Sequence, residues 1–212
     1  MSAPLPLRLC LVRHGETDWN TEQRMQGWTD IPLNAHGLRQ AQALAQALQG
    51  VHFDAIVSSP LQRALATAQA VAGDRPIALE PRLRERHHGE LQGLTRAEMA
   101  QQHPALHAAL VARRPDFLPP GGEDIDAFAA RVQAALADLH RAHAGRTVLA
   151  VAHGGVLDVA YRLATGQDWR SPRQQPLPNA AINWLVADAQ GWRVEAFGQA
   201  AHLEAALDDA GG

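Results

Sequence analysis

Two patterns of apolar and polar positions alternate along the chain. Short continuous apolar runs are typical of strands buried on both faces, and apolar positions spaced three and four residues apart are typical of amphipathic helices. Strands that alternate with helices favour a mainly parallel sheet, so we expect a three-layer α/β/α sandwich. The predicted strands are residues 7–12, 53–57, 77–79, 147–152, 182–186 and 192–197, with one of the last two antiparallel.

Capping residues mark the expected helix ends. Asn34 is a good N-cap for a helix whose apolar face includes Leu38, and Pro60 is placed to be the first residue of the next helix. Residues 95–98 (Thr-Arg-Ala-Glu) form a capping box that opens a further helix. A long amphipathic helix begins at about Ile125.

The chain of 212 residues is expected to form one domain, residues 1–212. Its least regular part, about residues 83–122, holds short helical segments between prolines and glycines. We expect this part to be a small helical cap inserted over the edge of the sheet. The tail at about residues 203–212 is expected to be frayed.

Composition limits the partners and the compartment. With 19 basic and 22 acidic residues and a net charge of −3, the chain has no basic stripe, so no nucleic-acid partner is expected. No apolar stretch approaches the roughly 20 residues that span a bilayer, and the N-terminus lacks the pattern of a signal peptide. The one cysteine, Cys10, lies in the first strand and fits a reducing compartment. We therefore expect a cytoplasmic protein without a membrane partner; its oligomeric state is open, with a homodimer as one alternative.

Polar residues with little reason to end a core strand follow two of the predicted strands. Arg13-His14-Gly15 comes directly after the first strand, and His153-Gly154-Gly155 comes after strand 147–152. In a parallel sheet both carboxyl ends lie on the same edge, where open α/β sheets bind their ligands. The two segments should therefore meet at one site.

These residues are suited to bind a phosphoryl group. A neutral His14 can attack phosphorus, while Arg13 and Arg63 would bind the phosphate oxygens and disfavour protonation of the nucleophile. A protonated His153 would add a charge-assisted donor. Backbone amides from Gly154 onward, at the start of a helix, would add further donors.

The leaving group of a phosphate ester needs a proton. We expect Glu85 to donate this proton, because a carboxylic acid near an anionic substrate can have a raised pKa. The pair His87-His88 could suggest a metal, but no acidic or thiol partner lies at ligand spacing. No metal is therefore expected at this site.

Four segments, each at the end of a predicted strand or the head of a helix, resemble the histidine phosphatase superfamily, which includes the cofactor-dependent phosphoglycerate mutases. The resemblance covers about residues 7–197 and implies the phosphoglycerate mutase-like fold. The segments are Arg13-His14-Gly15-Glu16-Thr17 with Asn20, Ser58-Ser59-Pro60 with Arg63 and Thr67, Glu85-Arg86 with Gly89 and Gln92-Gly93, and His153-Gly154-Gly155.

The resemblance implies a role for each matching residue. His14 would be the phosphorylated nucleophile, and Glu85 would be the proton donor and acceptor. The family needs no metal for this chemistry, and its partner is a small phosphate ester. The phosphate pocket would consist of Arg13, Arg63 and His153, with Asn20, Gln26, Gly27, Arg86 and Gly154 as substrate-binding residues.

The phosphatase and mutase branches differ in how well they keep water from the phosphoenzyme. Gly155 stands where the mutases typically have Asn, and residues 121–123 follow where they carry a longer insertion, so a smaller cap and a wetter site favour hydrolysis. Arg113-Arg114, however, is similar to a mutase stretch that grips a substrate carboxylate. Asp158 stands where many phosphatases have Arg, which leaves the subfamily open.

We therefore expect a metal-independent phosphomonoesterase that acts on small phosphorylated metabolites and needs no cofactor. A phosphoglycerate mutase, which would use 2,3-bisphosphoglycerate, is the first alternative. A non-catalytic phosphate-binding scaffold is the second.

Overall fold

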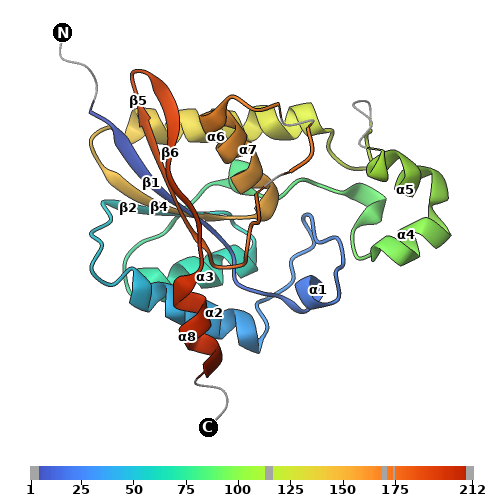
Figure 1. The fold of residues 1–212 in the computed structure, drawn as a ribbon, viewed down its shortest axis with the longest axis horizontal. Helices are drawn as coiled ribbons and strands as arrows, with labels where there is room; N and C mark the ends of the chain where they lie inside the picture. Colours follow the sequence, from blue (N-terminus) through green and yellow to red (C-terminus); the bar gives the residue numbers. More distant parts are fainter. Residues whose placement is uncertain (1–4, 113–116, 169–170, 174, 209–212) are drawn as a thin grey trace.

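A six-stranded sheet lies between two layers of helices in the computed structural model, which describes residues 5–112, 117–168, 171–173 and 175–208 (Figure 1). The strands are β1 (Leu7–Arg13), β2 (Ala55–Ser58), β3 (Ala78–Leu79), β4 (Thr147–Ala152), β5 (Ile182–Asp188) and β6 (Gly191–Gln199). They lie in the order β3-β2-β4-β1-β5-β6. β5 is antiparallel to both of its neighbours, and the remaining neighbours are parallel. The expected mainly parallel α/β fold is confirmed.

The helices cover both faces of the sheet. They are α1 (Asp18–Thr21), α2 (Ala35–Ala47), α3 (Gln62–Ala72), α4 (Arg96–Gln102), α5 (Pro104–Val111), α6 (Ile125–Ala142), α7 (Gly154–Thr165) and α8 (Ala201–Asp208), with short 3₁₀ turns η1 (Pro81–Leu83) and η2 (Gly89–Leu91). α6 and α7 lie on one face, and α2 and α3 lie on the other (Figure 1).

Alternation along the central strand β1 divides the core into two clusters. Leu9 and Leu11 pack with the apolar sides of α6 and α7, whereas Cys10 and Val12 pack with those of α2 and α3. Successive side chains of a strand point to opposite faces, so a strand that is apolar throughout must be covered on both. This burial fixes β1, and with it the loop that follows the strand.

Two helix predictions are wrong in detail. Leu38 is 51% exposed, because Gly37 faces inward: a Cβ there would overlap the Glu16 carbonyl oxygen, so this close approach sets the rotation of α2. Pro60 does not begin α3, whose N-cap is Leu61. The backbone remains extended one residue past β2, since the Ser59 amide donates to the Val151 carbonyl at 2.9 Å.

The C-terminal part is more regular than expected. Residues 201–208 form α8, which packs against α2, where the sequence predicts a frayed tail from about residue 203 (Figure 1). Residues 209–212 lie outside the described residues. Because the stabilising surface is supplied by α2, far away in the sequence, local patterns do not show it.

The segment expected to be a cap contains η2, α4 and α5, and Figure 1 shows α4 and α5 to one side of the sheet. The capping box of Thr95 and Glu98 is confirmed, and so is the helix start at Pro104. Arg113 and Arg114 lie outside the described residues. The single-domain organisation and the limits of the cap stay predictions.

No helix in the described part of the chain is both long enough and apolar enough to cross a membrane.

Candidate active site

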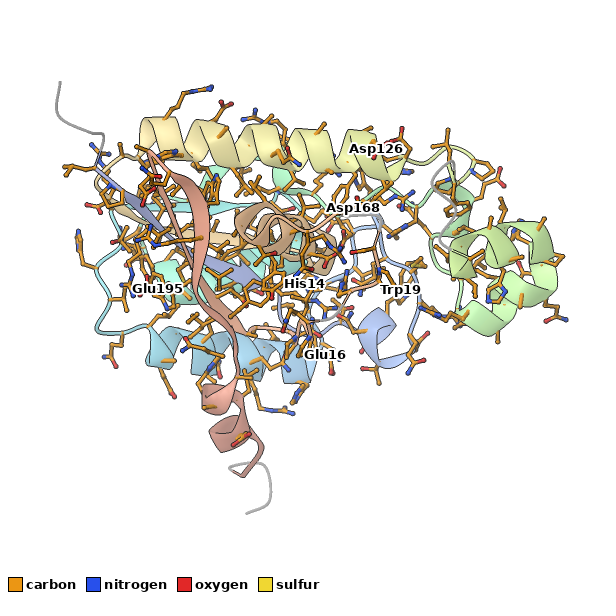
Figure 2. The ribbon with its side chains drawn as sticks, turned by 45° about the horizontal axis from the view of Figure 1, so that its top comes forward. His14, Glu16, Trp19, Asp126, Asp168 and Glu195 are labelled. Carbon is orange, nitrogen blue, oxygen red and sulfur yellow. The ribbon has the colours of Figure 1, made fainter. Side chains whose placement is uncertain are left out.

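The ends of β1 and β4 bring the two polar segments together. These strands are parallel neighbours with Arg13 opposite Ala152, and the His14 amide donates to the Ala152 carbonyl at 3.0 Å. The rings of His14 and His153 consequently lie with their centroids 5.2 Å apart. Figure 2 shows His14 near the middle of the molecule, with Glu16 and Trp19 on the chain that follows it.

His14 is buried and held in one orientation. Its side chain is 3% exposed, and Nδ1 lies 2.6 Å from the Gly15 carbonyl oxygen. A carbonyl only accepts hydrogen bonds, so Nδ1 carries the proton and Nε2 keeps its lone pair. Burial, reinforced by the charges of Arg13 and Arg63, holds the pKa of His14 well below its usual value. The imidazole is therefore neutral at neutral pH, as the sequence argument requires of a nucleophile.

Arg63 lies in the first turn of α3 and is fully buried. Its two Nη atoms donate to the carbonyls of Thr29 (2.9 Å) and Gly27 (2.7 Å), and its buried Nε has no partner among the described residues. Burial lowers the pKa of Arg63 to about 10, so the side chain remains charged at neutral pH. Gly27 thus orients Arg63 through its backbone carbonyl, and its expected contact with substrate stays a prediction.

Arg13 ends β1. Its Nη1 donates to the Leu177 carbonyl at 2.6 Å, and its Nε is buried without a partner in the described structure. This Nε lies 3.6 Å from where a Cβ of Gly154 would stand, which places the guanidinium against the start of α7. Burial lowers the pKa of Arg13, and the charge of Glu85 opposes that shift.

His153 is fully buried as the N-cap of α7. Its Nε2 lies 2.8 Å from the Ser59 hydroxyl, and its Nδ1 is buried without a partner among the described residues. Burial holds the pKa of His153 well below its usual value, and the charges of Arg63 and Arg13 lower it further. The expectation of a protonated His153 is wrong here, since its closest charged neighbours are cations.

Glu85 follows η1 and faces the start of α7. Its carboxylate accepts hydrogen bonds from the backbone amides of Arg86 (2.8 Å) and Gly155 (3.0 Å). Burial raises the pKa of Glu85, but the neighbouring His88 and the two amide donors lower it more, so the net direction is downward. The raised pKa expected for this carboxyl is therefore not present in the structure.

The backbone beside Glu85 is held by two side chains that the sequence analysis missed. The Glu85 carbonyl accepts from Trp28 Nε1 at 2.7 Å and from an Nη2 of Arg131 at 2.8 Å. Arg131 also donates to the carbonyls of Arg82 and Arg84 and forms an ion pair with Glu123. Arg131 lies within a helix of mixed polarity, so nothing local distinguishes it from a surface charge.

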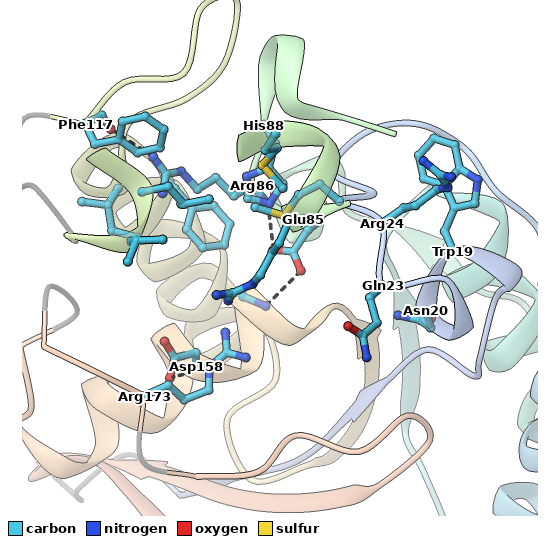
Figure 3. A pocket seen from close by; sticks show the side chains of 18 of the residues that line it. Trp19, Asn20, Gln23, Arg24, Glu85, Arg86, His88, Phe117, Asp158 and Arg173 are labelled. Carbon is cyan, nitrogen blue, oxygen red and sulfur yellow. Dashed lines mark hydrogen bonds and ion pairs between the residues drawn. The ribbon is translucent and has the colours of Figure 1, made fainter. Parts of the chain in front are cut away.

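A pocket of about 710 Å³ opens beside Glu85 (Figure 3). Glu85 and Gly155 line the pocket, whereas the buried His14 and His153 are not part of its lining. Both apolar and polar side chains line it. The apolar residues include Met99, Leu110, Val111, Phe117 and Phe128, and the polar ones include Asn20, Gln23, Arg86, His88, Asp158 and Arg173.

The remaining predicted substrate contacts have structural partners of their own. Asn20 lines the pocket, but its Oδ1 closes the capping box of α1 with Thr17. Arg86 lines the pocket too, and its Nε donates to the Glu123 carbonyl at 2.7 Å. Gln26 is buried outside the pocket lining, and its Oε1 has no partner among the described residues.

Two further residues support the loop of His14. Asn179 Nδ2 donates to the His14 carbonyl at 2.9 Å, and the Gly15 amide donates to Thr67 Oγ1 at 2.9 Å. Thr67 belongs to a segment already singled out by the family resemblance, whereas Asn179 belongs to none of those segments. Only the folded chain shows that Asn179 lies beside this loop.

Metal ligands are a separate question. Within the described ranges, no group of three or more His, Cys, Asp or Glu side chains is placed to hold a metal ion. His87 and His88 are the pair that could suggest a metal site, but their surroundings differ. His87 Nδ1 accepts from the Gly89 amide at 3.0 Å, whereas His88 lines the pocket.

A neutral histidine whose pKa is lowered by two neighbouring arginines, with a carboxylate whose charge acts on both arginines, is an arrangement suited to phosphoryl transfer. Comparison with known proteins agrees with this class. The family model of the histidine phosphatase superfamily (branch 1) matches residues 9–200, so the chain belongs to that superfamily.

Named relatives fall on both sides of the phosphatase and mutase division. A metal-independent phosphoserine phosphatase of Arabidopsis thaliana is 38% identical over 92% of this chain and 82% of its own. Phosphoglycerate mutase-like protein 4 of the same plant is 34% identical over 92% of this chain and 86% of its own. A phosphoserine phosphatase of Entamoeba histolytica, solved with 3-phosphoglyceric acid, superposes with a TM-score of 0.81 at 29% identity, covering 93% of this chain and 99% of its own.

Proposed function

We propose that this protein is a metal-independent phosphomonoesterase that acts on small phosphorylated metabolites through a covalent phosphohistidine on His14. The observation that carries this proposal is a set of buried nitrogens without partners among the described residues, gathered around a neutral His14: Nε of Arg13, Nε of Arg63 and Nδ1 of His153. Buried polar atoms are rarely left unpaired, so such a set indicates a site for an anion.

In the first step, Nε2 of His14 attacks phosphorus. Arg13 and Arg63 bind the phosphate oxygens through N–H groups that their carbonyl partners leave free. A neutral His153 that accepts the Ser59 hydroxyl proton at Nε2 carries its own proton on Nδ1 and donates it in a hydrogen bond to the phosphate. The bond between phosphorus and the ester oxygen breaks, and the phosphoryl group is transferred to His14.

Glu85 supplies the proton that the leaving oxygen needs. Its pKa is lowered in the structure, but a bound phosphate dianion is a like charge and disfavours ionisation of the carboxyl. We therefore expect the substrate itself to raise the pKa of its acid. In the second step, the Glu85 carboxylate takes a proton from the water that attacks phosphorus, and inorganic phosphate leaves His14 unmodified.

Hydrolysis is favoured over mutase activity by the pocket. It is large and lined in part by charged side chains, which admit water to the phosphoenzyme, whereas a mutase must exclude it. Relatives named as phosphatases support the same choice. Phosphoglycerate mutase activity with 2,3-bisphosphoglycerate is the alternative, since another relative is named phosphoglycerate mutase-like protein 4.

Phosphate release from a panel of phosphomonoesters in the presence of a chelator tests the proposal. We expect several esters to be hydrolysed, and we expect a phosphoenzyme that is stable in base but labile in acid. His14→Ala should lose both hydrolysis and phosphoenzyme formation. His52→Ala is the matched control: the His52 side chain is 85% exposed, so its replacement should change neither hydrolysis nor phosphoenzyme formation.

The panel includes 3-phosphoglycerate, with its conversion to 2-phosphoglycerate followed in the same mixture. Isomerisation with little phosphate release would establish the mutase instead. Absence of both turnover and phosphoenzyme would favour the non-catalytic scaffold. Loss of activity in chelator that added metal restores would contradict the metal-independent mechanism.

A further inference from the structure

Arg173 brings a positive charge into the pocket from a segment that none of the family motifs includes. It precedes β5 in the chain and lines the pocket together with Glu85 (Figure 3). Its side chain is 43% exposed, and its Nε lies 3.4 Å from Oδ1 of Asp158. No other polar partner of Arg173 occurs in the described part of the chain, so both of its Nη groups are free to bind a ligand.

Arg173 is held in place by a chain of contacts. Asp158 on α7 forms a second ion pair, at 3.1 Å, with Nε of Arg162, whose side chain is only 2% exposed. Arg162 also donates to the Ser171 hydroxyl at 2.6 Å and to the Asp168 carbonyl, which ties the segment before Arg173 to α7. The buried Arg162 thus holds Asp158 in place, and Asp158 orients Arg173.

The charge of Arg173 reaches the catalytic end of the pocket. Arg173 and Glu85 line the same pocket, and the charge of Arg173 lowers the pKa of Glu85 and contributes to the lowered pKa of Arg13. Figure 3 shows Asp158 and Arg173 across the pocket from Asn20 and Gln23, with Glu85 between the two sides. A phosphate ester whose ester oxygen faces Glu85 would direct its alcohol part into this space.

We propose that Arg173, oriented by Asp158, binds a carboxylate on the alcohol part of the substrate. A guanidinium presents two parallel N–H groups that match a carboxylate, and here the Nη pair has no competing partner among the described residues. The substrate class is then phosphate monoesters of small hydroxy acids or hydroxy amino acids. This inference rests on the proposed phosphatase function and assigns it a specificity residue.

Gln23 provides a second polar group for the same substrate. Its backbone has φ 56°, a left-handed conformation that is costly for a residue other than glycine. Such conformations occur where the surrounding structure holds them, often at ligand sites. Here this turn at the end of α1 directs the amide of Gln23 into the pocket (Figure 3), where it can bind a polar group on the side of the substrate opposite Arg173.

The test compares O-phosphoserine with O-phosphoethanolamine, which has the same amino alcohol skeleton without the carboxylate. We expect the native protein to prefer O-phosphoserine. Arg173→Met should reduce kcat/KM for O-phosphoserine about 10- to 100-fold, mainly through KM, as expected for loss of hydrogen bonds between charged groups. Its kcat/KM for O-phosphoethanolamine should change by less than about 3-fold.

Two variants separate a specific contact from a general electrostatic field. Arg96→Met removes another arginine of the same pocket and should leave the ratio between the two esters unchanged. Asp158→Asn should weaken the preference while Arg173 is still present, and Arg173→Lys should restore part of it. The role of Arg173 would be overturned if Arg173→Met reduced kcat/KM equally for both esters. It would also be overturned if Arg96→Met changed the ratio of the two kcat/KM values as much as Arg173→Met does.

Binding distinguishes failure of this inference from failure of the proposed function. Calorimetry of the two esters with His14→Ala measures the carboxylate preference without turnover. No preference in that titration overturns the role of Arg173, even if p-nitrophenyl phosphate is hydrolysed through His14. A preference that Arg173→Met abolishes supports the role of Arg173 even if no ester is hydrolysed, in which case the phosphatase proposal alone fails.

Discussion

Replacing Gly155 by alanine should misplace Glu85, the proposed catalytic acid, without disturbing the fold. A Cβ on residue 155 would stand 2.2 Å from Oε1 of Glu85 and 3.0 Å from Cζ of Phe128. The carboxylate must therefore move by about 1 Å to reach an ordinary contact distance. Because the overlapping atom is the end of a flexible side chain, the protein should still fold.

The expected loss of rate follows from that displacement. General acid catalysis contributes about 10²- to 10⁴-fold, and a misplacement of about 1 Å can remove about 10² of it. We therefore expect kcat for esters with poor leaving groups, such as alkyl phosphates, to fall about 100-fold. p-Nitrophenyl phosphate, whose leaving group needs little protonation, should lose less than about 10-fold.

The assay is the ratio of kcat for these two kinds of ester, measured in Gly155→Ala, Glu85→Gln and the double variant. The double variant should be no slower than Glu85→Gln, because both changes remove the same function. Gly50→Ala is the control, since nothing lies within 4 Å of a Cβ there. Equal losses for both esters, or full additivity with Glu85→Gln, would refute the reasoning.

Two further predictions concern stability. His14, His153 and His88 all have pKa values below that of an unfolded histidine, and that of His88 is lowered to about 4 by burial. The unfolded chain therefore binds more protons than the native protein below pH 6.5, and each of these histidines should lower the free energy of unfolding by about 1.4 kcal/mol for each unit by which the pH falls from 6.5 to 4. Urea titrations of the native protein and of His88→Gln measure this dependence on pH. Equal slopes of the free energy of unfolding against pH in the two proteins would contradict the prediction for His88. Arg131→Met should lower the free energy of unfolding by about 2–4 kcal/mol, because the carbonyls of Arg82 and Arg84 lose a donor, the Glu85 carbonyl keeps only Trp28 as a donor, and Glu123 loses its ion pair. The variant should also reduce kcat for alkyl phosphates more than for p-nitrophenyl phosphate. Loss of stability alone would leave Arg131 a purely structural role.

Much of the fold follows from local patterns. Continuous apolar runs predict β1 and β4 because a strand buried on both faces must be apolar throughout, and Asn34 caps α2 because its side chain accepts from the Gly37 amide. Leu38 shows where local patterns stop being sufficient. Its exposure results from the close approach of Gly37 to Glu16, a contact between separate elements.

The site could be predicted where its residues follow directly from strand ends. His14 and His153 meet because β1 and β4 are parallel neighbours, which the alternation of strands and helices indicates. The charge of His153 could not be predicted in the same way, since it depends on which groups surround the folded imidazole. Arg131 and Arg173 could not be found either, because their roles depend on carbonyls and a carboxylate supplied by other parts of the chain.

The sheet order has a consequence for synthesis of the chain. β1 is the first strand to leave the ribosome, yet its neighbours β4 and β5 are among the last, so the centre of the sheet depends on pairing across most of the sequence. Contacts so distant along the chain make folding slow, and a nascent chain without residues 147–188 leaves β1 unpaired on both edges. Catalytic competence should consequently appear as the last event of refolding, which makes recovery of turnover a sensitive reporter of the completed native state.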